Sequence, residues 1–60
     1  MNVDPTPLHT LDQVAERLQV STKTVRRWIA TGDIVAYRFG RQLRISEADL
    51  SAFIRLHRQG

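Results

Sequence analysis

The segment Ser21–Ile29 combines three cations with an apolar face. At about 3.6 residues per helical turn, Lys23, Arg26 and Arg27 point away from a face that collects Val25, Trp28 and Ile29. The hydroxyl groups of Thr22 and Thr24 lie beside the cations. Cations gathered on the exposed side of a short helix are typical of a surface that binds a polyanion. The segment therefore predicts a recognition helix, with duplex DNA as the expected partner.

The net charge of +3 is concentrated in the middle third of the chain. Residues 1–20 carry one arginine against three carboxylates, a sum of −2, and residues 45–60 sum to zero. Residues 21–44 carry six cations against Asp33 alone, a sum of +5. A solvated surface usually mixes its signs, so this block favours phosphate binding.

After residue 34 the apolar residues no longer follow a helical period and instead alternate with other residues. This pattern indicates a β-hairpin. A two-residue loop, Gly40-Arg41, would mix polar and apolar side chains on both faces of the hairpin. We therefore expect a three-residue loop at 40–42, with the pairs Phe39 and Leu43, Tyr37 and Ile45, and Arg38 and Arg44.

In this register Arg38 and Arg44 lie side by side, and a nucleic-acid backbone across them would relieve their repulsion. Arg41 at the loop tip is the candidate to enter a groove. An alternative for Arg44 is an ion pair with Asp33 or Asp49 that braces the hairpin.

Capping signals predict three helices. The first, residues 11–18, follows Thr10 in a Thr-x-x-Gln capping box, and the second, residues 22–31, follows Ser21. Only two residues separate the first helix from the cap of the second, so the two helix axes must cross at a steep angle, as in a helix-turn-helix. A third helix starts at Ser46 in a Ser-x-x-Asp motif.

The order helix, helix, two-stranded wing, helix predicts a winged helix-turn-helix domain, mainly α with a small β-hairpin. Sixty residues allow one domain. We assign residues 1–7, which contain two prolines, to a flexible tail and residues 8–58 to the domain. Leu8 is the first residue expected in the core, and its large side chains are expected to be Trp28, Ile29, Phe39, Leu50 and Phe53.

Several functional classes lack support in this sequence. We expect no enzyme, because no phosphate-binding glycine loop, nucleophile motif or catalytic acid pair is found. Without cysteine, and with His9 expected to be exposed and His57 interfacial, we expect no metal or cofactor. The sequence contains no apolar run of about 18 residues, the length that spans a membrane, and no signal peptide. We therefore expect a cytoplasmic, nucleoid-associated protein with no membrane contact. We also expect no small-molecule ligand.

One ordered set of motifs extends over nearly the whole chain, about residues 8–56: Val20-Ser21, Thr24-Val25-Arg26-Arg27-Trp28-Ile29, Gly32, Arg38-x-Gly40-Arg41, Arg44-Ile45 and Asp49-Leu50-x-x-Phe53. This set resembles the phage and mobile-element excisionase family, whose fold is related to the MerR DNA-binding domain. Gln19 departs from many helix-turn-helix proteins, which carry glycine in the turn.

The resemblance implies a second helix in the major groove and a wing over an adjacent minor groove. It matches Lys23 and Arg27 to base-facing positions, Arg26 to a position near phosphates, and Gly40 and Arg41 to the wing tip. The full set of predicted DNA-binding residues is Ser21, Thr22, Lys23, Thr24, Arg26 and Arg27 on the helix, and Arg38, Gly40, Arg41, Gln42 and Arg44 on the wing.

The resemblance also implies an excisionase, or recombination directionality factor, that binds and bends attachment-site DNA cooperatively beside an integrase. A MerR-like transcriptional regulator, or the amino-terminal module of one, is an alternative within DNA binding. An alternative of another class is a protein-docking adaptor whose basic block meets an acidic partner or structural RNA.

Overall fold

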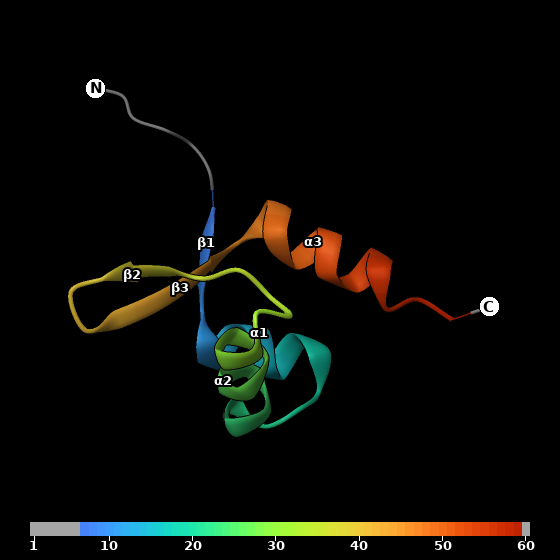
Figure 1. Ribbon diagram of the computed structural model, residues 1–60, viewed down its shortest axis with the longest axis horizontal. Coiled ribbons are helices and arrows are strands. Elements are labelled where there is room, and N and C mark those ends of the chain that lie inside the picture. Colours follow the sequence, from blue (N-terminus) through green and yellow to red (C-terminus); the bar gives the residue numbers. More distant parts are fainter. Residues whose placement is uncertain (1–6, 60) are drawn as a thin grey trace.

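The computed structural model describes residues 7–59 (Figure 1). Its elements, in chain order, are β1 (Leu8–Thr10), α1 (Leu11–Leu18), α2 (Thr22–Thr31), β2 (Tyr37–Phe39), β3 (Gln42–Ser46) and α3 (Glu47–Leu56). The predicted architecture of three helices and a hairpin is confirmed, and β1 adds a third strand. Residues 1–6 of the predicted tail lie outside the described residues. The carbonyl of Pro7 accepts a hydrogen bond from the Glu47 N–H at 3.0 Å.

Helix α1 begins with the predicted capping box. The Thr10 hydroxyl accepts from the Gln13 N–H at 3.1 Å, and the Gln13 side chain accepts from the Thr10 N–H at 2.8 Å. The cap satisfies N–H groups that have no partner within the helix. The predicted apolar face is confirmed, because Leu11, Val14 and Ala15 are buried.

The turn between α1 and α2 depends on Gln19, which adopts a left-handed conformation with φ 58°. The N–H groups of Gln19 and Val20 donate to the carbonyls of Glu16 at 3.2 Å and Ala15 at 2.9 Å. This is the Schellman arrangement, in which a left-handed residue closes a helix. The chain turns here and starts α2 at Ser21, with glutamine in the conformation that glycine adopts most easily.

Helix α2 ends at Gly32, as predicted, with φ 82°. The Trp28 carbonyl accepts from the Asp33 N–H at 2.8 Å and from the Ile34 N–H at 3.3 Å. These bonds turn the chain back toward the body of the molecule. Ile34 thereby enters the core with 3% of its surface exposed, a position that sequence analysis missed.

The sheet is antiparallel with strand order β1-β3-β2. Strand β1 pairs His9 with Ile45 across its centre. Three residues next to a proline carry little local strand signal, and the partner strand lies far along the chain, so the pattern did not predict β1. The expectation that Leu8 reaches the core is wrong, because its surface is 42% exposed.

The predicted hairpin register is wrong. Strand β2 pairs Tyr37 with Arg44, Arg38 with Leu43 and Phe39 with Gln42, so the loop is the two-residue Gly40-Arg41. Arg38 and Arg44 are therefore not opposite each other.

The loop explains this register. On the central strand β3, Arg44 pairs with Thr10 of β1 on one side and with Tyr37 of β2 on the other. Gly40 has φ 64°, and a positive φ at the first loop position is what two-residue hairpin loops favour. Since the outer hairpin extends beyond the core, nothing there requires an all-apolar face, and Phe39 is 54% exposed. The prediction that Phe39 belongs to the core is wrong for the same reason.

Helix α3 starts at Ser46, as predicted, and its buried Leu50 and Phe53 close the core. The Ser46 hydroxyl accepts from the Asp49 N–H at 3.0 Å. The core consists of Leu11, Val14, Ala15, Val25, Ile34, Ile45, Leu50 and Phe53, with Trp28 and Ile29 partly buried against it.

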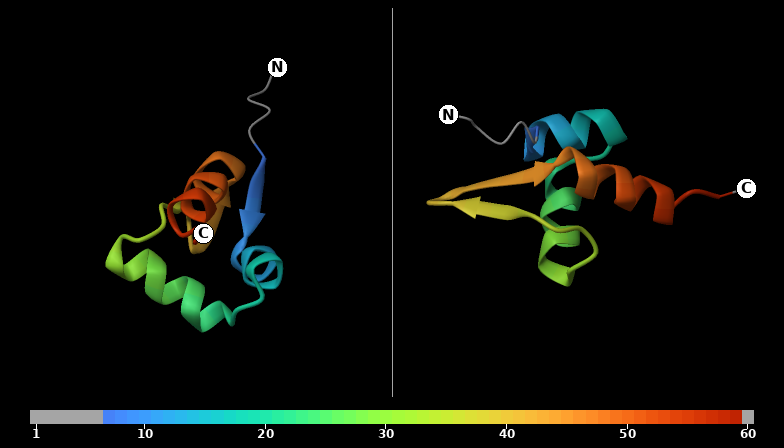
Figure 2. Two further views of the ribbon diagram at one scale, coloured as in Figure 1. Left: turned by 90° about the vertical axis from the view of Figure 1, so that its right-hand side faces the viewer. Right: turned by 90° about the horizontal axis from the view of Figure 1, so that it is seen from above.

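The hairpin and α3 extend toward opposite ends of the long axis of the molecule. Figure 1 and the right-hand view of Figure 2 both show the tip of β2 and β3 at one end and the carboxyl end of α3 at the other. Helices α1 and α2 pack against each other beside the sheet. The wing therefore has free surface around its tip.

Candidate nucleic-acid interface

Helix α2 exposes its cations and buries its apolar side. Val25 is fully buried, whereas Lys23, Arg26 and Arg27 are exposed. Successive residues of a helix are about 100° apart, so Arg26 and Arg27 point in clearly different directions. The three cations cover a broad solvent-facing arc instead of a single line.

The amino-terminal turn of α2 is held by hydroxyl groups that sequence analysis assigned to binding. The Ser21 hydroxyl accepts from the Thr24 N–H at 3.1 Å, and the two hydroxyl oxygens lie 3.0 Å apart. Thr22 is half-buried. The capping bond fixes the start of α2 and leaves the positive end of its dipole facing solvent, where anions are favoured.

The wing presents four exposed predicted residues, Arg38, Gly40, Arg41 and Gln42. Arg44 is half-buried instead. Its guanidinium donates to the Leu43 carbonyl at 2.8 Å and to the side chain of Gln42. Arg44 is therefore braced within its own strand.

The alternative ion pair of Arg44 with Asp33 or Asp49 is not found in the described part of the chain. The Asp33 carboxylate instead accepts from the Thr31 hydroxyl at 2.7 Å, and the Asp49 carboxylate accepts from the Ser46 hydroxyl at 2.8 Å. Both carboxylates belong to local turns and caps.

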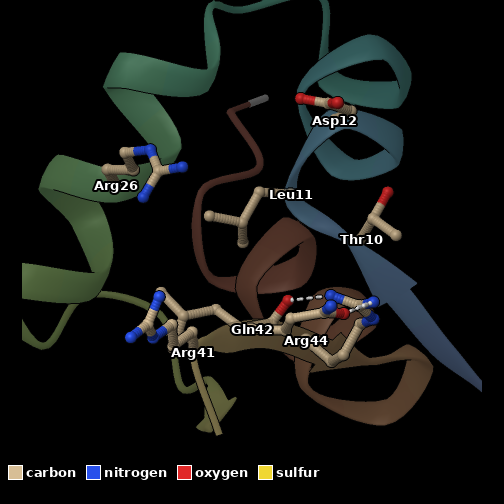
Figure 3. Close-up of a pocket in the computed structure, with 8 residues that line it drawn as sticks. Thr10, Leu11, Asp12, Arg26, Arg41, Gln42 and Arg44 are labelled. Atoms are coloured by element: carbon tan, nitrogen blue, oxygen red, sulfur yellow. Dashed lines mark hydrogen bonds between the residues drawn. The ribbon is translucent and has the colours of Figure 1, made fainter. Parts of the chain in front are cut away.

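A hollow of about 320 Å³ lies between α2 and the wing (Figure 3). Arg26 of α2 and Arg41 of the wing tip both line it, although 15 positions separate them in sequence. Gln42 and Arg44 contribute from β3, Thr10 from the end of β1 and Asp12 from the start of α1. We call this hollow the arginine cleft.

The charge of the arginine cleft is positive. Among residues 7–59, three guanidinium groups line it against the one carboxylate of Asp12. Across residues 7–59, Glu47 forms an ion pair with Arg17 and a hydrogen bond with His9, and neither Arg26 nor Arg41 takes part in an ion pair. Guanidinium groups that line one hollow and form no ion pair are suited to hold a phosphate.

Sequence analysis missed the contribution of α1 to this cleft. Thr10 and Asp12 were interpreted as a cap and a dipole-compensating residue, and the cap is confirmed. Their additional position beside the wing follows from β1, because Thr10 pairs with Arg44. Sequence patterning carries no signal for that pairing.

Lys23, Arg27 and Arg38 do not line the arginine cleft. The first two share the exposed side of α2, and Arg38 lies opposite Leu43 on the hairpin. The described residues contain no cluster of three or more His, Cys, Asp or Glu side chains placed to hold a metal ion. Nor does any helix between residues 7 and 59 have the length and apolar character needed to cross a membrane.

Comparison with known proteins gives one family and two relatives. The model of a helix-turn-helix domain matches residues 10–58. The excisionase of Mycobacterium phage D29 is 45% identical over 47 residues, which cover 77% of this chain and 84% of the phage protein. The uncharacterized protein YvgK of Bacillus subtilis (strain 168) is 41% identical over 51 residues, 85% of this chain. The matched part spans 17% of the length of YvgK. No solved structure matches the chain.

Proposed function

The chain belongs to the helix-turn-helix domain family, as an excisionase-type member, and on this premise we propose that it binds duplex DNA sequence-specifically. In this proposal α2 lies in the major groove and the β2–β3 wing lies over the backbone or the adjacent minor groove. The observation that carries the proposal is the arginine cleft, where the second helix and the wing tip present guanidinium groups to one hollow.

Residues of α2 divide into base-reading and backbone-binding groups in this proposal. Lys23 and Arg27 read base edges, because they are exposed and stand apart from the wing. Arg26 holds a phosphate at the arginine cleft. Ser21, Thr22 and Thr24 lie at the amino-terminal turn, where backbone N–H groups and hydroxyl groups bind a second phosphate.

The wing supplies backbone and groove contacts. Arg41 at the tip and Arg38 beside it bind phosphates on either side of the groove that the wing crosses. Gly40 permits the tight turn that brings the tip close to the DNA. Gln42 and Arg44 are linked to each other by a hydrogen bond and support the cleft from its floor.

We further propose that the protein is a recombination directionality factor of the excisionase type. The relationship to the phage D29 excisionase supports this assignment. A module of this size covers about 600 to 1,000 Å² of its own surface on DNA, which is small for a unique site. Several copies bound to repeated sites would supply the missing specificity. Together they would bend the DNA and act beside an integrase, at the nucleoid in the cytoplasm.

A transcriptional regulator is the second candidate, and one observation favours it. The matched segment of YvgK is a small part of that protein, so related domains also occur within longer chains. In such a chain the domain would serve as a DNA-binding module. Gel shifts on attachment-site DNA and on promoter DNA, each with and without an integrase, distinguish this candidate from an excisionase.

The test of DNA binding begins with selection of bound sites from a random duplex library. Affinity for the selected site is then measured at several salt concentrations. With four to six phosphate contacts, the logarithm of the association constant should fall with the logarithm of salt at a slope of about −4 to −5. A flat salt response, or a library that yields no preferred site, would contradict the proposal.

The adaptor alternative makes a different prediction for NMR. Random duplex DNA should shift the amide resonances of residues 23–27 and of the wing if α2 enters the groove. Shifts confined to α1 or α3 would support the adaptor instead.

A further inference from the structure

An apolar groove of about 380 Å³ lies beside the carboxyl-terminal part of α3. That end of α3 lies away from the wing (Figure 2). The groove is lined by side chains from the end of α1, from α2 and from the carboxyl-terminal part of α3. None of its lining residues comes from β2 or β3, and none takes part in the arginine cleft. The DNA-binding proposal leaves this groove without a role.

Aromatic rings form one wall of the groove. The rings of Trp28 and Phe53 lie 4.8 Å apart between centroids at an angle of 43°, and Phe53 stacks on the His57 ring at 4.1 Å and 29°. His57, which was expected to be interfacial, stacks on Phe53 but is exposed to solvent. Leu18, Val20 and Ile54 add aliphatic surface, and Ile54 is 39% exposed. Such a wall favours apolar side chains of a partner.

The rim of the groove is positively charged. Arg55 and Arg58 line it, both are exposed, and no carboxylate of the described residues lines it with them. The carboxyl end of α3 contributes the equivalent of about half a negative charge, which is less than the charge of two guanidinium groups. Within residues 7–59 neither arginine forms an ion pair.

Helix α2 separates the groove from the arginine cleft. Trp28 lines the groove and Arg26 lines the cleft. Two positions on a helix are about 200° apart, so the two side chains leave α2 on nearly opposite sides. A ligand in the groove and DNA at the cleft can be bound at the same time.

A second copy of this chain is poorly matched to the groove. On the exposed, acidic side of α1, Asp12 and Glu16 have no exposed large apolar residue beside them. The wing does expose Tyr37 and Phe39, but it surrounds them with arginines that Arg55 and Arg58 would repel.

We propose that the groove docks an acidic amphipathic segment of another protein while DNA is bound at the arginine cleft. Apolar side chains of the segment lie against the aromatic wall, and carboxylates flank them and pair with Arg55 and Arg58. The groove thus supplies a protein-binding surface in addition to the proposed DNA-binding surface.

The test selects peptides from a random displayed library with the full chain as bait. The enriched peptides should carry apolar residues at helical spacing together with Asp or Glu. Because Trp28 is the single tryptophan, its emission reports directly on the groove and should shift to the blue when a selected peptide binds. Affinity measured by this shift should be unchanged in the presence of a bound DNA duplex.

Charge reversal locates the site. The double variant Arg55→Glu and Arg58→Glu should bind a selected peptide more than about tenfold more weakly, because like charges then face each other. The matched double variant Arg38→Glu and Arg41→Glu should bind the peptide normally and lose DNA affinity. Circular dichroism checks that both variants fold, and Ile54→Lys, at an exposed wall position, supplies an independent variant that should also lose the peptide.

Four outcomes of the peptide experiments would overturn the proposal. They are a library without enrichment, enriched peptides that lack carboxylates, peptide affinity that survives the changes at residues 54, 55 and 58, and displacement of the peptide by DNA. Sedimentation that detects a dimer with Trp28 buried would also overturn it, in favour of a second copy. Apart from displacement by DNA, these outcomes do not depend on whether the salt and site-selection experiments support DNA binding.

Discussion

Arg26 and Arg27 are adjacent in sequence but lie in different surroundings. Arg26 lines the arginine cleft together with Arg41, whereas Arg27 is exposed outside it. A phosphate contact contributes to binding on any duplex, while a base contact contributes mainly on the preferred site. The two kinds of residue should therefore respond differently to DNA sequence.

Arg27→Ala should weaken binding to the selected site by about 1 to 3 kcal/mol and binding to random DNA by much less. Arg41→Ala should weaken both more evenly, because its proposed contact is with the backbone or the minor-groove edge. Fluorescence anisotropy at one fixed salt concentration measures both effects. If Arg27→Ala lost the same binding free energy on both DNAs, Arg27 would not contact the bases.

Gln19 carries the conformational strain of the turn between α1 and α2. Its φ of 58° lies in the left-handed region, which costs an ordinary residue about 1 to 2 kcal/mol. Gln19→Gly should therefore raise the free energy of unfolding by about 0.5 to 1 kcal/mol, measured in urea. Gln19→Ala serves as the control, since it keeps a Cβ and should give no such gain. Equal stabilities of the glycine and alanine variants would exclude strain at this position.

At the scale of elements, the hairpin is the part whose position matters most for the proposed function. Its two-residue loop places Arg41 at the tip and Gln42 opposite Phe39. The loop depends on Gly40, whose φ is 64°. A Cβ at Gly40 would meet no atom within 4 Å, so substitution there changes backbone energy without a clash.

Gly40→Ala should destabilise the hairpin by about 1 to 2 kcal/mol and lower DNA affinity, because the wing tip loses its turn. Gly40→Asn should lose less, since asparagine tolerates the left-handed region better. Urea unfolding and NMR contacts between the strands measure the effect. Contacts of Phe39 with Leu43 in the unaltered protein, in place of Gln42, would contradict the two-residue loop.

At the scale of the whole molecule, Glu47 joins three elements. As the first residue of α3, it pairs with Arg17 of α1 at 2.9 Å and with His9 of β1 at 2.6 Å. The expectation that His9 is simply exposed is therefore wrong. Hydrogen bonds from Arg17, His9 and Ser51, in that order, lower the pKa of Glu47 from 4.5 to about 2.

This lowered pKa makes the fold sensitive to acid. A carboxyl whose pKa is lower in the folded state stabilises the fold above its unfolded pKa and loses that effect as pH falls. Stability should therefore decline between about pH 4.5 and pH 2 as Glu47 takes up a proton. Glu47→Gln should flatten this part of the curve of unfolding free energy against pH. Glu16→Gln, at an exposed position of α1, is the control, and an equal effect of both variants would contradict the assignment.

Local patterns in the sequence were sufficient for the helices and their ends. The cap at Thr10, the cap at Ser21 and the stop at Gly32 each depend on hydrogen bonds or φ values within a few residues. The same local periodicity predicted that the cations of α2 would be exposed. These features need no information about distant parts of the chain.

Contacts between distant residues decided the rest. The assembled core buried Ile45 and left Phe39 exposed on the outer hairpin, and the pairing of β1 with β3 placed Thr10 beside Arg44. The same packing brought Arg26 and Arg41 to one cleft and left an apolar groove beside Trp28. A strand can pair in several registers that satisfy its own pattern equally, so the choice depends on which side chains the assembled core can bury.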